Sequence, residues 1–138
     1  MSTTFSLEGK NAVVTGLSTG IGRAIAEALA REGANVAGDY QKDAEGAAIT
    51  RGLIEAQGRE ALIVHGSTAE EVHIDDMADQ VVARWGSLDI WVNNAARIFV
   101  KPFIEMTTEE WHGLLAANLH GYMLGCRAAA RKMAVQDG

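Results

Sequence analysis

Short apolar runs alternate with longer amphipathic segments four times along this chain, and this alternation constrains its fold more than any other feature. The apolar runs predict strands buried on both faces, at residues 12–14, 35–39, 61–65 and 88–93. The other segments have helical spacing and predict helices at 20–32, 43–57, 70–85 and 107–135. Such an alternation forms βαβ units with a parallel sheet, and right-handed crossovers place helices on both faces. We therefore predict an α/β fold, a Rossmann-like doubly wound parallel sheet of about four strands.

Apolar spacing also predicts which face of each helix packs on the sheet. The predicted faces are Ile21, Ile25, Ala28 and Leu29 in the first helix, Ile49, Leu53 and Ala56 in the second, and Ile74, Met77, Val81 and Trp85 in the third. The signals for the ends of helices are Gly33, Gly58 and Gly86, which follow the first three helices, and a capping box from Thr107 to Glu110 that opens the last one.

Composition excludes several classes of protein. The 138 residues are 48% hydrophobic and 22% charged, as expected for one globular domain, and the formal net charge of -6 disfavours a nucleic-acid partner. No apolar run approaches the ~18–20 residues of a membrane helix, so we expect no membrane partner. The single cysteine, Cys126, fits a reducing compartment, which predicts a cytoplasmic location, and its place on an apolar helix face predicts that it is buried. The four histidines have no metal-like spacing, so no metal site is expected.

The junction between the first strand and the first helix is rich in glycine. It reads Thr15-Gly16-Leu17-Ser18-Thr19-Gly20-Ile21-Gly22. The amides at a helix N-terminus are unpaired and favour an anion, and glycine lets the backbone turn tightly and approach a phosphate. The alternative is that the glycines only form the turn between strand and helix.

The spacing T-G-x-x-x-G-x-G resembles the short-chain dehydrogenase/reductase family, and three further segments support the resemblance. Residues 88–96 resemble its L-D-x-x-V-N-N-A-G stretch, residues 118–121 its N-L-x-G segment, and residues 7–10 its usual lead into the first strand. The match covers nearly the whole chain and is similar to the glucose 1-dehydrogenase-like and 3-oxoacyl-carrier-protein-reductase-like members.

The resemblance implies roles for individual residues. Gly16, Gly20 and Gly22 would shape a phosphate loop, and Ser18, Thr19 and Ile21 would line the cofactor. Asn94, Ala95 and Ala96 would pass beneath its ribose and nicotinamide. Asn118 matches the family's catalytic asparagine, which holds a water in a proton relay; alternatively, it satisfies helix backbone at a kink. Two departures are Ala96, where the family has glycine, and Ser67-Thr68, where its Asp-Val contacts the adenine.

The end of the second strand bears on the choice between NAD and NADP. A carboxylate there accepts a hydrogen bond from the 2′-hydroxyl of NAD and repels the 2′-phosphate of NADP. Asp39 is such a carboxylate, although many NAD-using members have the acid where this chain has Tyr40. Thr19 replaces a basic residue common in NADP-preferring members, which leaves Lys42 as the cation near the strand end. We expect NAD rather than NADP; alternatively, Asp39 is an exposed turn carboxylate.

The family's catalytic Ser and Tyr-x-x-x-Lys are not in this sequence. The tyrosines are Tyr40 and Tyr122, and the residues four places after them are Ala44 and Cys126. The resemblance therefore implies that residues 1–138 are the NAD(P)-binding N-terminal portion of a single-domain oxidoreductase, truncated before those residues. The parent would transfer hydride between nicotinamide and a small alcohol or carbonyl substrate, and this chain alone would be inactive.

The sequence leaves two other functions open. One is a non-catalytic dinucleotide-binding or interaction module, and the other is a truncation fragment with no function of its own. In all three cases the fourth strand would be an edge of the sheet with unpaired backbone groups. We therefore expect a homo-oligomer, a domain-swapped form or a marginally stable chain.

Overall fold

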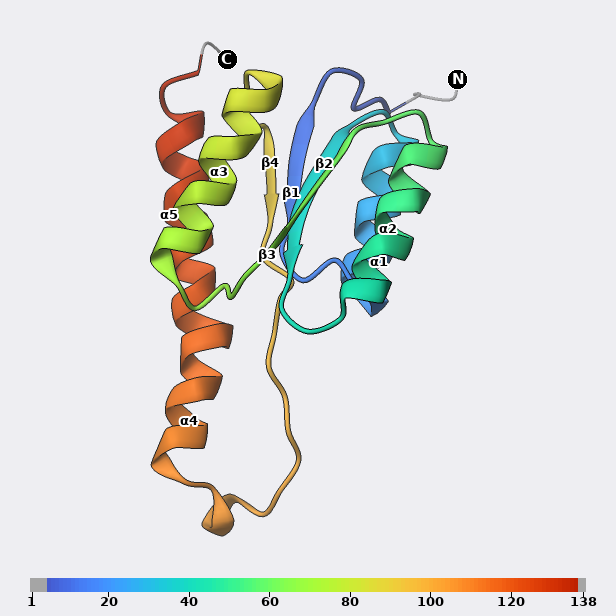
Figure 1. Cartoon of the computed structure of the whole chain (residues 1–138). Coiled ribbons are helices and arrows are strands. Elements are labelled where there is room, and N and C mark those ends of the chain that lie inside the picture. The colour runs from blue at the N-terminus through green and yellow to red at the C-terminus, as the bar shows by residue number, and fades with distance from the viewer. Residues whose placement is uncertain (1–4, 137–138) are drawn as a thin grey trace.

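Four parallel strands form one sheet in the order β3-β2-β1-β4 in the computed structural model, which describes residues 5–136 (Figure 1). The strands are β1 (Asn11–Val14), β2 (Asn35–Tyr40), β3 (Ala61–His65) and β4 (Ile90–Val92). The register pairs Val13 with Ala37 of β2 on one side and with Trp91 of β4 on the other. This confirms the predicted parallel α/β sheet. The predicted domain, 1–138, extends at both ends past the part that the structure describes.

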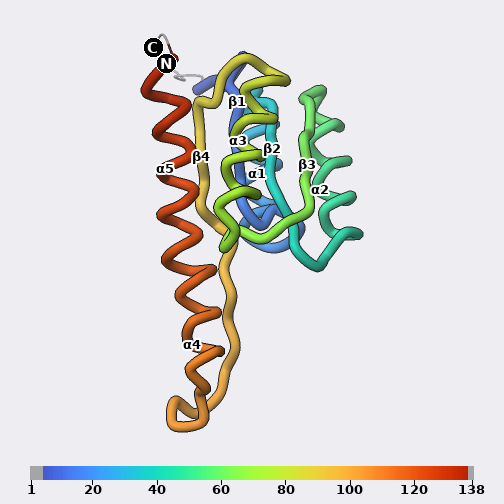
Figure 2. The backbone as a smooth tube through the Cα atoms, turned by 60° about the vertical axis from the view of Figure 1, so that its left-hand side comes forward, coloured from blue at the N-terminus to red at the C-terminus, as the bar shows by residue number. Residues whose placement is uncertain are grey.

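Helices cover both faces of the sheet (Figures 1 and 2). One layer consists of α1 (Gly20–Arg31) and α2 (Ala44–Ala56), and the other of α3 (Glu71–Trp85) and α5 (Gly121–Met133). The last helix begins well beyond the sheet as α4 (Thr108–Leu115) and continues through η2, a π-helical turn at Ala116–His120. An extended segment leads away from β4 to the short η1 (Phe103–Glu105), which precedes α4. From there α4 runs back toward the sheet beside the extended segment (Figure 2).

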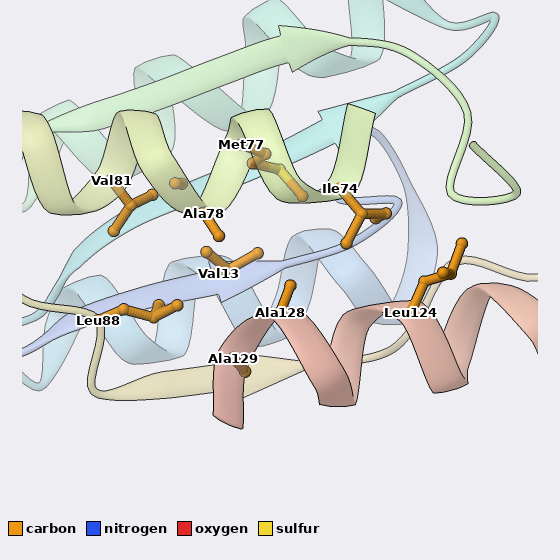
Figure 3. Packing of buried hydrophobic residues seen from close by; sticks show 10 residues of the cluster. Val13, Ile74, Met77, Ala78, Val81, Leu88, Leu124, Ala128 and Ala129 are labelled. Carbon is orange, nitrogen blue, oxygen red and sulfur yellow. The ribbon is translucent and has the colours of Figure 1, made fainter. Parts of the chain in front are cut away.

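The core divides into two clusters because the side chains of a strand alternate between the two faces of the sheet. Val13 and Ala37 face α3 and α5, and their cluster is completed by Ile74, Met77, Ala78, Val81, Leu88, Leu124, Ala128 and Ala129 (Figure 3). Val14 and Val36 belong to the cluster beside α1 and α2, with Leu17, Ala26, Ala30, Ile54 and Ala61. Burial on both faces explains why β1 reads as a continuous apolar run.

The predicted packing face is right for α3, partly right for α1, where Ile25 and Leu29 pack against the core, and wrong for α2. In α3 the residues Ile74, Met77 and Val81 are fully buried. In α1, however, Ile21 is 73% exposed, and in α2 Ile49 is 49% exposed. The residues buried in their place are Gly22, Ala26 and Ala30 in α1 and Gly46, Ala47, Thr50 and Ile54 in α2. These two helices pack closely through small side chains, which a search for large apolar residues does not find.

The predicted signals for helix ends are confirmed. Gly33, Gly58 and Gly86 all have positive φ angles, which residues with a side chain rarely adopt. At the start of α4, Thr107 Oγ1 accepts a hydrogen bond from the Glu110 amide at 3.2 Å, and a Glu110 carboxylate oxygen accepts one from the Thr107 amide at 2.9 Å. Hydrogen bonds from Lys101 and from the Thr107 amide hold the pKa of Glu110 below its usual value. The capping box therefore fixes where α4 begins.

Within residues 5–136, no helix combines the length and the apolar character that a membrane crossing needs.

Candidate functional site

The loop between β1 and α1 ends in an open helix N-terminus. Thr19, the residue before α1, has extended backbone angles, and its side chain makes no capping hydrogen bond. Thr19, Gly20 and Ile21 are all exposed. A helix leaves its first amides unpaired unless a cap or a ligand accepts from them, and these amides carry the positive end of the helix dipole. The geometry at this point suits an anion.

Two glycines of the loop have no room for a side chain. A Cβ on Gly22 would lie 2.3 Å from the Gly16 carbonyl oxygen and 2.5 Å from Nδ2 of Asn94. A Cβ on Gly16, whose φ is +69°, would lie 2.9 Å from Cα of Ala95. Gly20 differs, since its φ is +56° and no atom lies within 4 Å of the position of a Cβ. The glycines therefore permit close packing of the loop on the segment after β4 and leave its outer side open, which a simple turn does not require.

Thr15 joins the loop to the segment that follows β4. Its Oγ1 accepts hydrogen bonds from the amides of Asn94 at 3.0 Å and Ala95 at 3.1 Å. In return, Nδ2 of Asn94 donates to the carbonyls of Thr15 at 3.0 Å and Gly16 at 3.1 Å. The structure thus brings Asn94 and Ala95 against the loop. Ala96, which follows these two residues, is exposed.

Arg23 binds the back of the loop to α2. Its Nε donates to Thr50 Oγ1 at 3.1 Å, and its Nη2 donates to the carbonyls of Gly46, at 3.2 Å, and Ser18. Thr50 Oγ1 in turn donates to the Leu17 carbonyl at 2.8 Å. Arg23 is not among the residues that the sequence predicted for the site. The available signal was a charged residue directly after Gly22, on a helix that packs through glycine and alanine.

Asp39 lies near the end of β2, as predicted, but its side chain points into the protein. Its side chain is only 2% exposed; one carboxylate oxygen accepts from the Gly16 amide at 2.7 Å, and the other lies 2.9 Å from Nε2 of His73. It is therefore neither positioned to accept from a ribose hydroxyl nor an exposed turn carboxylate. The pleat of β2 turns Asp39 inward, and the half-buried Tyr40 follows at the strand end with its ring 5.3 Å from that of His65.

Ser67 and Thr68 lie in the connection from β3 to α3. This connection follows the carboxyl end of β3, so it lies at the same end of the parallel sheet as the glycine loop. Both are half-buried, and Ser67 Oγ accepts from the Ala69 amide at 3.3 Å. The carbonyl oxygen of Thr68 lies 2.8 Å from where a Cβ of Gly121 would be. This close packing holds the connection against the start of α5.

Asn118 lies on the π-helical turn η2 and is bound to the segment after β4. Its Oδ1 accepts from the Arg97 amide at 2.7 Å, and its Nδ2 donates to the Arg97 carbonyl at 2.8 Å. The side chain thus satisfies backbone at a helix irregularity, but the backbone is that of a neighbouring segment. Cys126, predicted to be buried, is exposed, and its Sγ accepts from Nδ2 of Asn93 at 3.3 Å. Among residues 5–136 no cluster of side chains suits a metal ion.

Comparison with known proteins gives the chain its family. The family model described as short chain dehydrogenase matches residues 10–138. The chain belongs to the short-chain dehydrogenase family. The resemblance read from the sequence motifs is thereby confirmed, and the family is one of oxidoreductases that use NAD or NADP.

The chain spans about half the length of the short-chain dehydrogenases that it matches. It is 39% identical to 3beta-hydroxysteroid dehydrogenase 1 of Eggerthella lenta, over 89% of the chain and 47% of that protein. It is 38% identical to glucose 1-dehydrogenase 2 of Bacillus subtilis, over 92% and 50%. The crystal structure of a short chain dehydrogenase from Burkholderia cenocepacia in complex with NADP matches with a TM-score of 0.88 and 40% identity, over 91% and 51%. A short-chain type dehydrogenase/reductase from Mycobacterium marinum matches with a TM-score of 0.88 and 34% identity, over 94% and 52%.

Proposed function

We propose that these 138 residues are the cofactor-binding N-terminal portion of a single-domain, NAD(P)-dependent oxidoreductase. The observation that carries the proposal is the open start of α1, where exposed Thr19 and Gly20 adjoin a loop held in place by Gly16 and Gly22. The residues present fit a dinucleotide, because the tight glycine contacts all lie on the protein side of the loop and its outer side is free.

Each part of the site has a role in this proposal. The amides at the start of α1 hold the pyrophosphate, with Ser18, Thr19 and Ile21 beside it. Asn94, Ala95 and Ala96 form the surface beneath the ribose and nicotinamide, and Thr15 fixes that surface to the loop. The hydroxyl groups of Ser67 and Thr68 contact the adenine. When bound, the nicotinamide ring accepts or gives a hydride in exchange with an alcohol or carbonyl substrate.

Cofactor binding and turnover are separate properties in this proposal. Asn118 is the residue of the catalytic machinery that this sequence carries, and neither Tyr40 nor Tyr122 has a lysine four residues later. General acid–base catalysis needs a group with a tuned pKa within hydrogen-bond reach of the substrate oxygen. We therefore propose that these residues bind the dinucleotide without turning over a substrate on their own.

NAD is the proposed cofactor, with only modest discrimination against NADP. The first arginine after β2 is Arg51, and its guanidinium donates to the Ala61 carbonyl at 3.1 Å, so it is already engaged within the fold. The carboxylate of Asp39, however, is buried and does not oppose a 2′-phosphate directly. Exposed Lys42 favours such a phosphate weakly.

A titration with ADP-ribose, NADH and NADPH tests the proposal. We expect all three to bind, because the loop holds the part that they share, with NADH and NADPH differing by less than about tenfold in Kd. With NADH and a panel of small carbonyl compounds, we expect no oxidation above the rate without protein. Absence of binding by all three would contradict the proposal, and turnover would contradict its second half.

We also propose that the chain associates with itself. Among the described strands, β4 has a neighbour on one side only. Large apolar side chains are exposed between β4 and α4, namely Ile98 (86%), Val100 (96%), Phe103 (79%) and Ile104 (93%). Unpaired strand edges and contiguous apolar patches both promote association.

Sedimentation tests this association. We expect a species larger than one chain at micromolar concentration, and we expect Ile104→Glu to shift it toward the monomer. Val72→Glu is the matched control, since Val72 is 81% exposed but lies on a different element, α3. A stable, well-folded monomer in the unmodified chain would refute the proposal.

A further inference from the structure

A hydrogen bond between a largely buried histidine and a buried carboxylate lies directly behind the glycine loop. His73, on the first turn of α3, has Nε2 2.9 Å from one carboxylate oxygen of Asp39, and the two side chains are 11% and 2% exposed. The other oxygen of Asp39 accepts from the Gly16 amide at 2.7 Å. Three elements are thereby connected in one chain of hydrogen bonds, from α3 through β2 to the loop.

Close packing around His73 restricts the position of its imidazole ring. A Cβ on Gly66 would lie 2.1 Å from Nδ1 of His73, so the imidazole occupies the volume that a side chain at residue 66 would need. A carboxylate only accepts hydrogen bonds, so Nε2 of His73 carries the proton in this contact. The ring is therefore held in one orientation, with its donor directed at Asp39.

The contact matters to the loop because of what depends on Gly16. Gly16 has a φ of +69°, and its carbonyl accepts from Asn94, which lies beneath the proposed cofactor. A hydrogen bond to a charged acceptor is about twice as strong as a neutral one, and it is weakened when the acceptor is left free to turn. An Asp39 without His73 would keep one buried oxygen unpaired, which favours rotation of the carboxylate away from Gly16.

We propose that His73 is a positioning residue that acts through Asp39 to fix the amide of Gly16 and with it the turn of the glycine loop. This inference rests on the proposed function only for its effect on cofactor affinity. The effect on the Gly16 amide is a property of the chain itself and is measured without a ligand.

Hydrogen exchange at the Gly16 amide, followed by NMR, tests the proposal in the full chain. In His73→Ala we expect exchange at Gly16 to accelerate by roughly tenfold relative to that at Val14, a fully buried residue of the central strand β1 that reports on global stability. His73→Gln keeps a donor at a similar reach and should restore most of the protection, which loss of the imidazole's packing alone would not allow. His112→Ala, on an exposed histidine of α4, is the control and should change neither amide.

A cycle with Asp39→Asn tests whether His73 acts through Asp39. If it does, replacing His73 by alanine should accelerate exchange at the Gly16 amide less in the Asp39→Asn background than in the natural chain. The Kd for ADP-ribose should rise roughly tenfold in His73→Ala and less in His73→Gln. An unchanged ratio of Gly16 to Val14 exchange in both His73 variants would overturn the inference. If the natural chain binds no ADP-ribose, the proposed function fails while the exchange measurement still decides the role of His73.

Discussion

Replacing Gly22 by alanine is expected to weaken dinucleotide binding by roughly a hundredfold, the equivalent of one or two hydrogen bonds to a charged group. The added methyl group would lie 2.3 Å from the Gly16 carbonyl oxygen and 2.5 Å from Nδ2 of Asn94. Neither neighbour is the free end of a flexible side chain, since one is backbone and the other donates to the carbonyls of Thr15 and Gly16. The loop must therefore move away from α1. This movement displaces the amides of the proposed phosphate site from the positions in which they would bind the phosphate. We expect the free energy of unfolding to fall as well, by about 1–3 kcal/mol.

Gly52 provides a matched control for this substitution within the same chain. It lies on the exposed side of α2, and a Cβ there would meet no atom within 4 Å. Gly52→Ala should therefore raise the free energy of unfolding by about 0.5–1 kcal/mol, because alanine loses less conformational entropy in a helix, and leave the Kd unchanged. Calorimetric titration with ADP-ribose and denaturant unfolding measure both quantities. Equal effects of the two substitutions on the Kd would show that the contacts of Gly22 are not what preserves the loop.

Replacing Thr15 by valine should lower the free energy of unfolding by about 2–4 kcal/mol, since two amides lose their acceptor at a buried position. Thr15 is 2% exposed, and its Oγ1 accepts from both Asn94 and Ala95. Valine has nearly the same shape, so packing is retained and the loss isolates the hydroxyl group. Release of residues 94 and 95 also frees the surface proposed to lie beneath the nicotinamide.

Thr15→Ser separates the hydroxyl group from the methyl group. Serine keeps the acceptor and loses one methyl group, so we expect a loss of only about 1 kcal/mol and a Kd for NADH close to that of the natural chain. Denaturant unfolding and NADH titration of the two variants give the comparison. If serine and valine destabilise the chain equally, the hydrogen bonds of Thr15 are not what stabilises this junction.

The order of the elements was predictable because each depends on signals that are local in the sequence. Gly33 and Gly86 end helices, and the capping box at Thr107 starts one, whatever the rest of the chain does. The packing faces of α1 and α2 were not predictable in the same way. Ile21 is a large apolar residue at the correct spacing, but it stands beside the loop and faces outward, and the small Ala26 and Ala30 face the sheet. In these two helices close packing on the neighbouring elements requires small residues, whereas the sequence pattern detects only large apolar ones.

The site was predictable where a motif is continuous and not where partners come from distant elements. The glycines from Gly16 to Gly22 could be found because their spacing is itself the signal. The direction of the Asp39 side chain depends on the pleat of β2, and an offset of one residue exchanges an outward carboxylate for a buried one. Its partner His73 lies 34 residues further along the chain, on another helix. No local pattern connects them.

The central position of β1 has a consequence for the order in which the chain assembles. Its second neighbour, β4, lies far along the chain from β1, and the contact between Thr15 and Val92 spans 77 residues. Closing so long a loop costs conformational entropy before the pairing compensates for it, so this step is slow compared with the pairing of β1 and β2. A nascent chain therefore has one side of its middle strand uncovered until residue 92 has left the ribosome. The hydroxyl group of Thr15 gains its partners within the fold, Val92, Asn94 and Ala95, only after that point, which makes completion of the glycine loop a late event in folding.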